Sequence, residues 1–113
     1  MAETVTLDRS EWTSTLDLLT KDHEGEQVTI ELLDMSFGDQ HEVERLPFAY
    51  LNYDPKDDVI IVAVGGKSAK YPVVLRHMIW HPAEVAVADS QDLGTVLRVA
   101  DSDGVTNLIT FHR

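Results

Sequence analysis

The chain has 113 residues, no cysteine and a formal net charge of −11 at pH 7, and 43% of its residues are hydrophobic. This length and apolar content predict one domain, residues 1–113, that buries a core without disulfides or metals, and the lack of cysteine excludes thiol nucleophiles and cysteine-ligated metal sites. Because nucleic acid and anionic membranes would repel a chain with 20 acidic and 9 basic residues, we expect neither as a partner.

The negative charge is concentrated in the first half of the chain. Residues 1–58 carry 15 acidic and 4 basic side chains, whereas residues 59–113 carry 5 of each. This excess of acidic residues is explained by a need for solubility. It would also suit binding to a basic protein partner. The N-terminus shows no signal-peptide pattern, and the longest apolar run, Val59 to Val64, is too short to span a bilayer. We therefore expect a cytoplasmic protein.

An amphipathic helix is expected near the N-terminus. Asp8 and Glu11 have the spacing of a capping box, in which two side chains satisfy backbone N–H groups at the start of a helix. Trp12, Leu16 and Leu19 then recur at helical spacing and form one apolar stripe. Such a stripe is more often core than a binding face, so we expect this helix to cover a sheet.

Strand periodicity follows the helix. Apolar residues alternate with polar ones in residues 27–33, and the unbroken apolar run at 59–64 indicates a central strand covered on both faces. Asp54 and Pro55 predict a turn at 54–58, and DSDG at 101–104 predicts a tight hairpin. Further strands are expected at 41–53, interrupted by Pro47, and at 84–89, 95–100 and 105–111.

A second, short helix is predicted at 72–81. Leu75, Met78 and Ile79 fit the i, i+3, i+4 spacing, and Pro82 disfavours helical geometry in the residue before it. The expected fold class is therefore α+β. It consists of an N-terminal amphipathic helix packed on a curled, mostly antiparallel sheet of five to six strands, with one short helix near 72–81.

The sequence RHMIWHP at 76–82 gathers most of the candidate site residues. His77 and His81 have the spacing at which one helix face presents two imidazoles to a metal, but Met78 stands where a metalloprotease helix carries glutamate. In the competing interpretation, Arg76, His77 and His81 face water or cap helix carbonyls. The candidate binding residues are Tyr71, Arg76, His77, Trp80 and His81.

Three other patterns are incomplete. GGKS at 65–68 lacks the earlier glycine of a phosphate loop, because Ile61 stands there. DSDG lacks the final glutamate of a calcium loop, because His112 is the twelfth residue. No serine lies in a strand–turn–helix elbow with flanking glycines. We therefore predict no catalytic residue, no metal and no cofactor.

Several segments, in their order along the chain, resemble an uncharacterised family of short bacterial proteins, a domain of unknown function. The resemblance covers nearly the whole chain, and it implies no reaction, cofactor or partner. It does imply that His77, His81 and Pro82 lie in a recurring stretch. The matching segments are Arg9–x–x–Trp12, His23–Glu24–Gly25, VTIELLD, FGDQ at 37–40, YDPKDD at 53–58, RHMIWHP and DSDG.

Two hypotheses about function follow. The first is a non-enzymatic binding or interaction module, either a homodimer formed through a sheet edge or the Tyr/Trp surface, or a protein with a separate protein partner. It accounts for the small size, the missing catalytic constellation and the uneven charge. The alternative is a small metal-dependent or anion-binding enzyme that uses His77 and His81, with Arg76 holding an anionic substrate.

Overall fold

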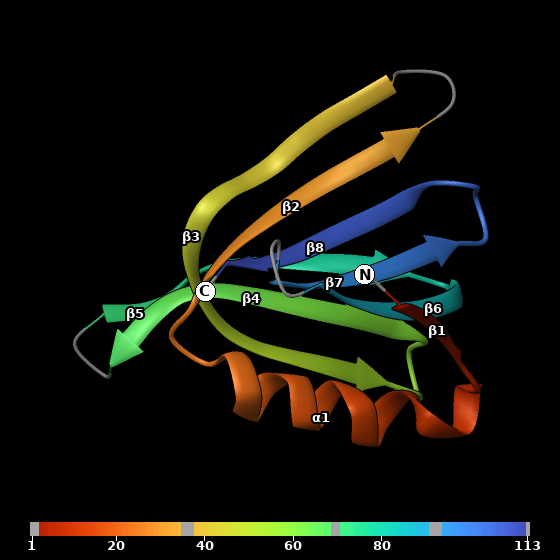
Figure 1. The fold of residues 1–113 in the computed structure, drawn as a ribbon, viewed down its shortest axis with the longest axis horizontal. Helices are drawn as coiled ribbons and strands as arrows, with labels where there is room; N and C mark the ends of the chain where they lie inside the picture. Colours follow the sequence, from red (N-terminus) through yellow and green to blue (C-terminus); the bar gives the residue numbers. More distant parts are fainter. Residues whose placement is uncertain (1–2, 35–37, 69–70, 91–93, 113) are drawn as a thin grey trace.

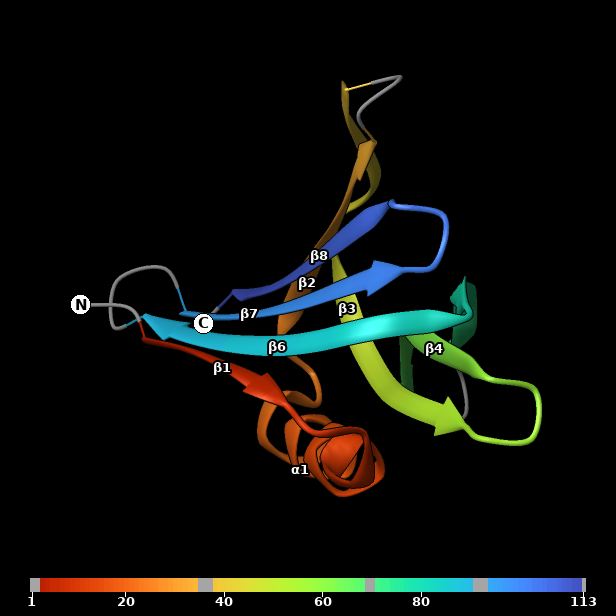
Figure 2. The same ribbon diagram turned by 90° about the vertical axis from the view of Figure 1, so that its right-hand side faces the viewer.

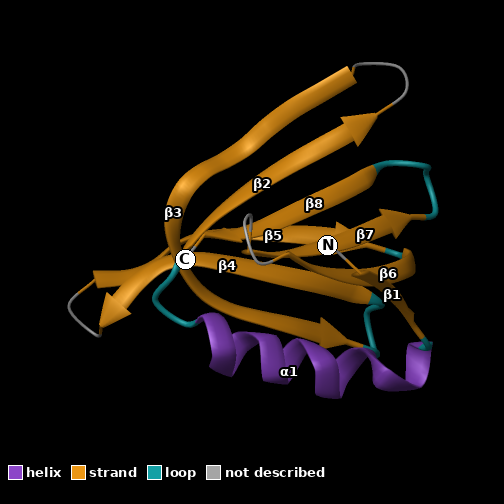
Figure 3. Ribbon diagram, in the orientation of Figure 1, coloured by secondary structure: helices purple, strands orange, loops and turns teal. Residues whose placement is uncertain are grey.

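A computed structural model describes residues 3–34, 38–68, 71–90 and 94–112. Within them the chain forms eight strands, a short 3₁₀ helix and one α-helix (Figures 1 and 3). The elements are β1 (Glu3–Leu7), η1 (Arg9–Glu11), α1 (Trp12–His23), β2 (Gln27–Asp34), β3 (Gly38–Asp54), β4 (Val59–Ser68), β5 (Tyr71–Trp80), β6 (Pro82–Ser90), β7 (Gly94–Asp101) and β8 (Thr106–His112).

The strands form one curled antiparallel sheet in the order β1-β6-β7-β8-β2-β3-β4-β5. The long strand β3 joins its two parts, because its first half pairs with β2 and its second half pairs with β4. Between the two halves, Arg45 has a left-handed φ of 52° and Pro47 cannot donate a ladder hydrogen bond. This irregular segment lets the strand bend, so that β3–β4–β5 faces the other strands across a shared core (Figure 2).

Helix α1 covers the opening of the curled sheet, on the side where β3 passes it (Figure 2). Its stripe of Trp12, Leu16 and Leu19 is buried in the core, as predicted. The capping box is also confirmed, since Asp8 accepts a backbone hydrogen bond and Glu11 Oε1 accepts one from the N–H of Asp8 at 3.0 Å. These local contacts cap the 3₁₀ helix η1, which leads directly into α1, and burial of the apolar face of α1 then holds it against the strands.

Both predicted turns are confirmed. Asp54 Oδ1 accepts hydrogen bonds from the N–H groups of Lys56 and Asp57, and this Asx turn connects β3 to β4. Asp101 Oδ1 accepts from Asp103 and Val105 in the β7–β8 hairpin. The expected central strand at 59–64 is also present, because β4 pairs with β3 on one side and β5 on the other.

The expected fold class is wrong. The sheet has eight strands rather than five to six, and residues 71–80 form strand β5 where a short helix was predicted. The physical reason is the apolar strand β4, which needs a neighbour on each side to pair its backbone and bury its side chains. In the described residues α1 is the one α-helix, so the fold is mainly β.

Candidate functional site

The side chains of β5 alternate between the core and the surface. Register with β4 places Ile79 opposite Ile60 and His77 opposite Val62. Ile60, Val62 and Ile79 are buried, and the half-buried His77 lies on the same side of the sheet. The intervening residues therefore lie on the outer face of the sheet. They are Arg76, Met78 and Trp80.

His77 is a structural link across the core. Its Nε2 lies 3.0 Å from Oδ1 of Asn107 on β8, and Asn107 is only 3% exposed. The Asn107 amide also donates to the carbonyl oxygen of Val99 at 3.2 Å. A buried amide needs such partners, because leaving one polar atom unpaired costs about 1–3 kcal/mol. The imidazole of His77 is thus occupied in joining β5 to the opposite part of the sheet.

The outer side of β5 carries large exposed side chains. Trp80 is 51% exposed and Met78 is 40% exposed. Arg76 Nε donates a 3.0 Å hydrogen bond to the hydroxyl of Tyr50 on β3. Strand β4 lies between β3 and β5, and its Ile61 is opposite Met78. We call these five residues, Tyr50, Ile61, Arg76, Met78 and Trp80, the outer patch.

His81 forms the corner between β5 and β6. It adopts a left-handed φ of 54°, donates its backbone N–H to the Asp58 carbonyl at 2.8 Å and accepts from Ser102 N–H at 3.0 Å. Its Nδ1 lies 3.4 Å from Asp58 Oδ2, with the imidazole largely exposed. This corner therefore fixes the 54–58 turn against the 101–104 turn.

A cluster of polar side chains around Arg9, beside this corner, joins three segments that are distant in the sequence. Arg9 Nη1 donates to Tyr53 Oη at 3.2 Å and lies 3.4 Å from Asp58 Oδ1, and its guanidinium stacks over the Trp12 ring at 4.3 Å. Arg9 also donates to the Pro82 carbonyl. These contacts hold the start of the helix to the corner, so we assign the cluster a structural role.

The hydrogen bonds in this cluster shift two pKa values. The 2.8 Å bond that Tyr53 donates, with smaller contributions from His81 and Arg9, holds the pKa of the Asp58 carboxyl below its usual range. Desolvation and the neighbouring Asp58 carboxylate raise the pKa of the Tyr53 hydroxyl. Both shifts favour the tyrosine as donor and the carboxylate as acceptor, which stabilises the observed arrangement.

The candidate residues do not converge on one point. Arg76 bonds Tyr50 on the outer face, His77 bonds Asn107 inside, and His81 faces Asp58 at the corner. Tyr71 has its backbone in β5, and its side chain lies outside the described residues. Among the described residues no group of three or more His, Asp or Glu side chains could hold a metal. Of the candidate residues, Arg76 and Trp80 share one sheet face, where Met78 lies between them.

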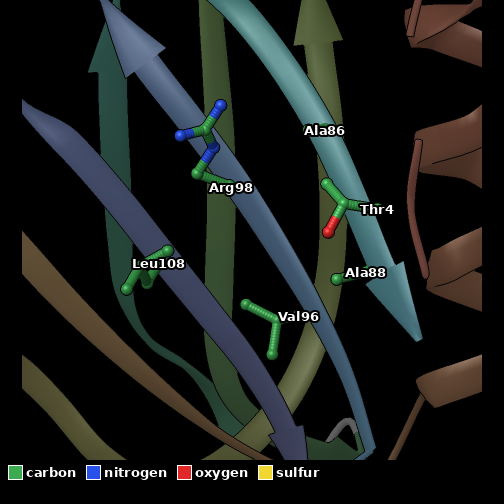
Figure 4. A pocket seen from close by; sticks show the side chains of 6 residues that line it. All are labelled: Thr4, Ala86, Ala88, Val96, Arg98 and Leu108. Atoms are coloured by element: carbon green, nitrogen blue, oxygen red, sulfur yellow. The ribbon is translucent and has the colours of Figure 1, made fainter. Parts of the chain in front are cut away.

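A shallow hollow of about 450 Å³ lies on the outer face of the other part of the sheet. In Figure 4, Leu108 and Thr4 lie on opposite sides of it, with Val96 and Arg98 between them. We call its lining residues the neutral face. They are Thr4, Ala86, Ala88, Val96, Arg98 and Leu108.

Sequence reasoning missed the neutral face and three of the five residues of the outer patch, Tyr50, Ile61 and Met78. The alternation of Val85 and Val87 with Ala86 and Ala88 could have shown a strand with small outward side chains. Likewise, interpreting residues 76–80 as a strand would have placed Met78 beside Trp80. The strand at 84–89 was predicted, so the signal for the neutral face was available, whereas the signal for the outer patch depended on recognising residues 71–80 as a strand.

Comparisons with known proteins give a family. The model of a family described as "Family of unknown function (DUF5335)" matches residues 3–113. An uncharacterised protein of Aquifex aeolicus (strain VF5) is 31% identical over 106 residues, which cover 94% of this chain and 89% of that protein. No solved structure matches the chain. Within the described residues, no helix has the length and apolar character needed to cross a membrane.

Proposed function

Because this chain belongs to the DUF5335 family, whose function is unknown, we propose a role from its surface: a non-enzymatic module that binds another protein through the outer patch. The observation that carries this proposal is the 51% exposure of Trp80 on a regular strand, beside the exposed Met78. An indole is costly to leave in water, and a rigid sheet holds this one in a fixed position.

The composition of the outer patch supports a protein partner. Trp, Tyr, Arg and Met are enriched at protein–protein interfaces, whereas Lys, Glu and Asp are depleted there, and the patch contains one of each enriched type with no carboxylate. Trp, Tyr and Arg also dominate the binding energy of measured interfaces. The bond between Arg76 and Tyr50 orders both side chains before binding, which lowers the entropy cost of association.

The proposal also includes a location and a type of partner for the module. The net charge of −11 argues against nucleic acid and anionic membranes as partners and favours a cytoplasmic protein partner. We take residues 1–113 as one domain, because α1 and both parts of the sheet contribute to a single core cluster. The enzyme alternative receives no support from Arg76, His77 and His81, which face three different surroundings.

The test compares two single variants of the full chain. Partners are captured with the wild-type protein and identified, and each purified partner is then titrated calorimetrically against wild type, Trp80→Ser and Leu18→Ser. We expect Trp80→Ser to weaken binding by roughly 30-fold, because truncating an interface tryptophan commonly costs about 2 kcal/mol. Leu18 is the matched control, since it is 59% exposed on α1, outside the outer patch.

Two results would contradict the proposal. Equal affinity of wild type and Trp80→Ser would remove the outer patch from the contact. Equal weakening by Leu18→Ser and Trp80→Ser would show a nonspecific hydrophobic effect. Circular dichroism of both variants must match wild type, which we expect because neither side chain belongs to the core.

A further inference from the structure

We propose that a second copy of this chain docks on the neutral face, so that two molecules associate through β1, β6, β7 and β8. This contact is distinct from the outer patch and rests on different observations. It concerns the side of the sheet opposite to the core, because Val85, Leu97 and Ile109 of the same strands point inward.

Charge is the first argument for a second copy. Arg98 is the one charged side chain of the neutral face, and it pairs with Glu84 at 2.6 Å, so the charges of these two residues balance. Glu31 of β2 lies opposite Leu108, at the edge of the face. The whole chain has a net charge of −11, and two copies repel each other wherever their acidic surfaces meet. Two identical acidic molecules can therefore meet at the neutral face without bringing unpaired charges of its lining residues together. A basic partner would gain nothing here.

Shape is the second argument. Thr4, Ala88 and Val96 are small, and neighbouring strands place them in one row of the sheet. Ala86, in the adjacent row, is only 1% exposed and leaves this part of the face low. Small side chains let two sheets approach to the usual packing distance of about 10 Å. A two-fold contact also uses the same patch on both molecules, so the Arg98–Glu84 pair of each copy meets the same pair of the other with the charges balanced.

The surface area of the neutral face limits how strongly two copies can associate. Four strands about 4.8 Å apart and some 25 Å long present roughly 500 Å² per copy. This is less than the roughly 800 Å² per partner of a standard interface. We therefore expect a concentration-dependent equilibrium between monomer and dimer rather than a permanent dimer.

Association through the neutral face leaves the outer patch free. The strands that carry the two surfaces face each other across the core, so their outer sides point away from one another (Figure 2). A dimer therefore displays two outer patches on its far sides. Such a bivalent particle binds a partner with repeated sites more tightly than either copy alone.

Sedimentation equilibrium of the full chain tests the proposal, over concentrations from roughly 10 μM to 500 μM. We expect the wild-type dimer fraction to rise with concentration. It should also rise when salt increases from roughly 0.1 M to 1 M, because the Debye length shortens from about 10 Å to about 3 Å and screens the repulsion between acidic copies. Val96→Lys should weaken association at least about tenfold, since it places two like charges in the contact.

Two variants keep the test independent of folding and of added charge. Thr4→Lys changes an exposed residue at the rim of the hollow and should also weaken association, with unchanged circular dichroism. Leu18→Lys adds the same charge on α1 and should associate as wild type does.

A wild-type protein that stays monomeric throughout overturns the proposal, as does undiminished association of both Val96→Lys and Thr4→Lys. Loss of association in Trp80→Ser, with Val96→Lys unaffected, would assign self-association to the outer patch instead. Loss of heterologous binding in Trp80→Ser with self-association retained is the expected pattern.

Discussion

Neighbouring residues of β5 have opposite surroundings. Ile79 is buried in the core and the half-buried His77 points across it to Asn107, whereas Arg76 and Trp80 lie on the outer surface of the sheet. The chemical character of these residues would suggest the reverse, because an indole is usually core and an imidazole is usually a surface or site residue. In this stretch the two-residue period of the strand decides which side chain lies on the outer surface and which points toward the core.

The largest expected effect comes from truncating the inner side of β5. Ile79→Ala removes a side chain that is 2% exposed, and we expect it to lower the free energy of unfolding by about 2–5 kcal/mol through lost burial and a cavity. Met78→Ala, one position away on the outer side, should change it by less than about 0.5 kcal/mol. Urea unfolding of both variants measures the difference, and similar losses would show that the two sides do not differ.

The pair His77→Ala and Arg76→Ala sharpens the comparison for polar side chains. Removing the imidazole leaves Oδ1 of the buried Asn107 without this partner, so we expect a loss of about 1–3 kcal/mol. Removing Arg76 breaks a bond of similar length to Tyr50 at the surface, where water replaces it, and should cost less than about 0.5 kcal/mol. Equal losses in urea unfolding would assign both bonds the same role.

The alternation of β5 ends at His81, which has a left-handed backbone conformation. At this position we expect backbone conformation to affect stability more than the chemistry of the side chain does. His81→Val places a β-branched residue at φ 54° and should destabilise the protein by about 1–2 kcal/mol. His81→Gly should be at least as stable as wild type, since glycine adopts this conformation freely and the exposed 3.4 Å contact with Asp58 contributes little. Thermal unfolding checks the order, and a more stable valine variant would refute the strain argument.

The smallest effect concerns acid sensitivity at the same corner. Hydrogen bonding lowers the folded-state pKa of Asp58, so in acid the unfolded chain takes up this proton first. The stability from this carboxylate is complete above about pH 4 and is lost as the pH falls through the folded value. Between about pH 7 and pH 3, wild type should therefore lose more stability than Asp58→Asn. Parallel losses in urea unfolding would show that this carboxylate contributes no acid sensitivity.

The candidate site was only partly predictable from the sequence. RHMIWHP is a dense group of polar and aromatic residues, and its assignment as a helix put His77 and His81 on a common face, which the strand β5 does not provide. Leu75, Met78 and Ile79 satisfy helical spacing, while His77 and Ile79 also satisfy strand spacing. A window this short cannot discriminate between the two periods, because the deciding partner, β4, is another segment of the chain.

Contacts between residues two to four positions apart are encoded locally. The capping box of Asp8 and Glu11, the Asx turn at Asp54 and the DSDG hairpin all close such short loops, so the sequence alone is sufficient to predict them. The bond between His77 and Asn107 and the contacts of Arg9 with Tyr53 and Pro82 join residues 30, 44 and 73 positions apart, and the strand β5 pairs with β4 at separations of up to 21 residues. Those features exist only once the sheet has curled, because pairing and burial, rather than local propensity, supply their free energy.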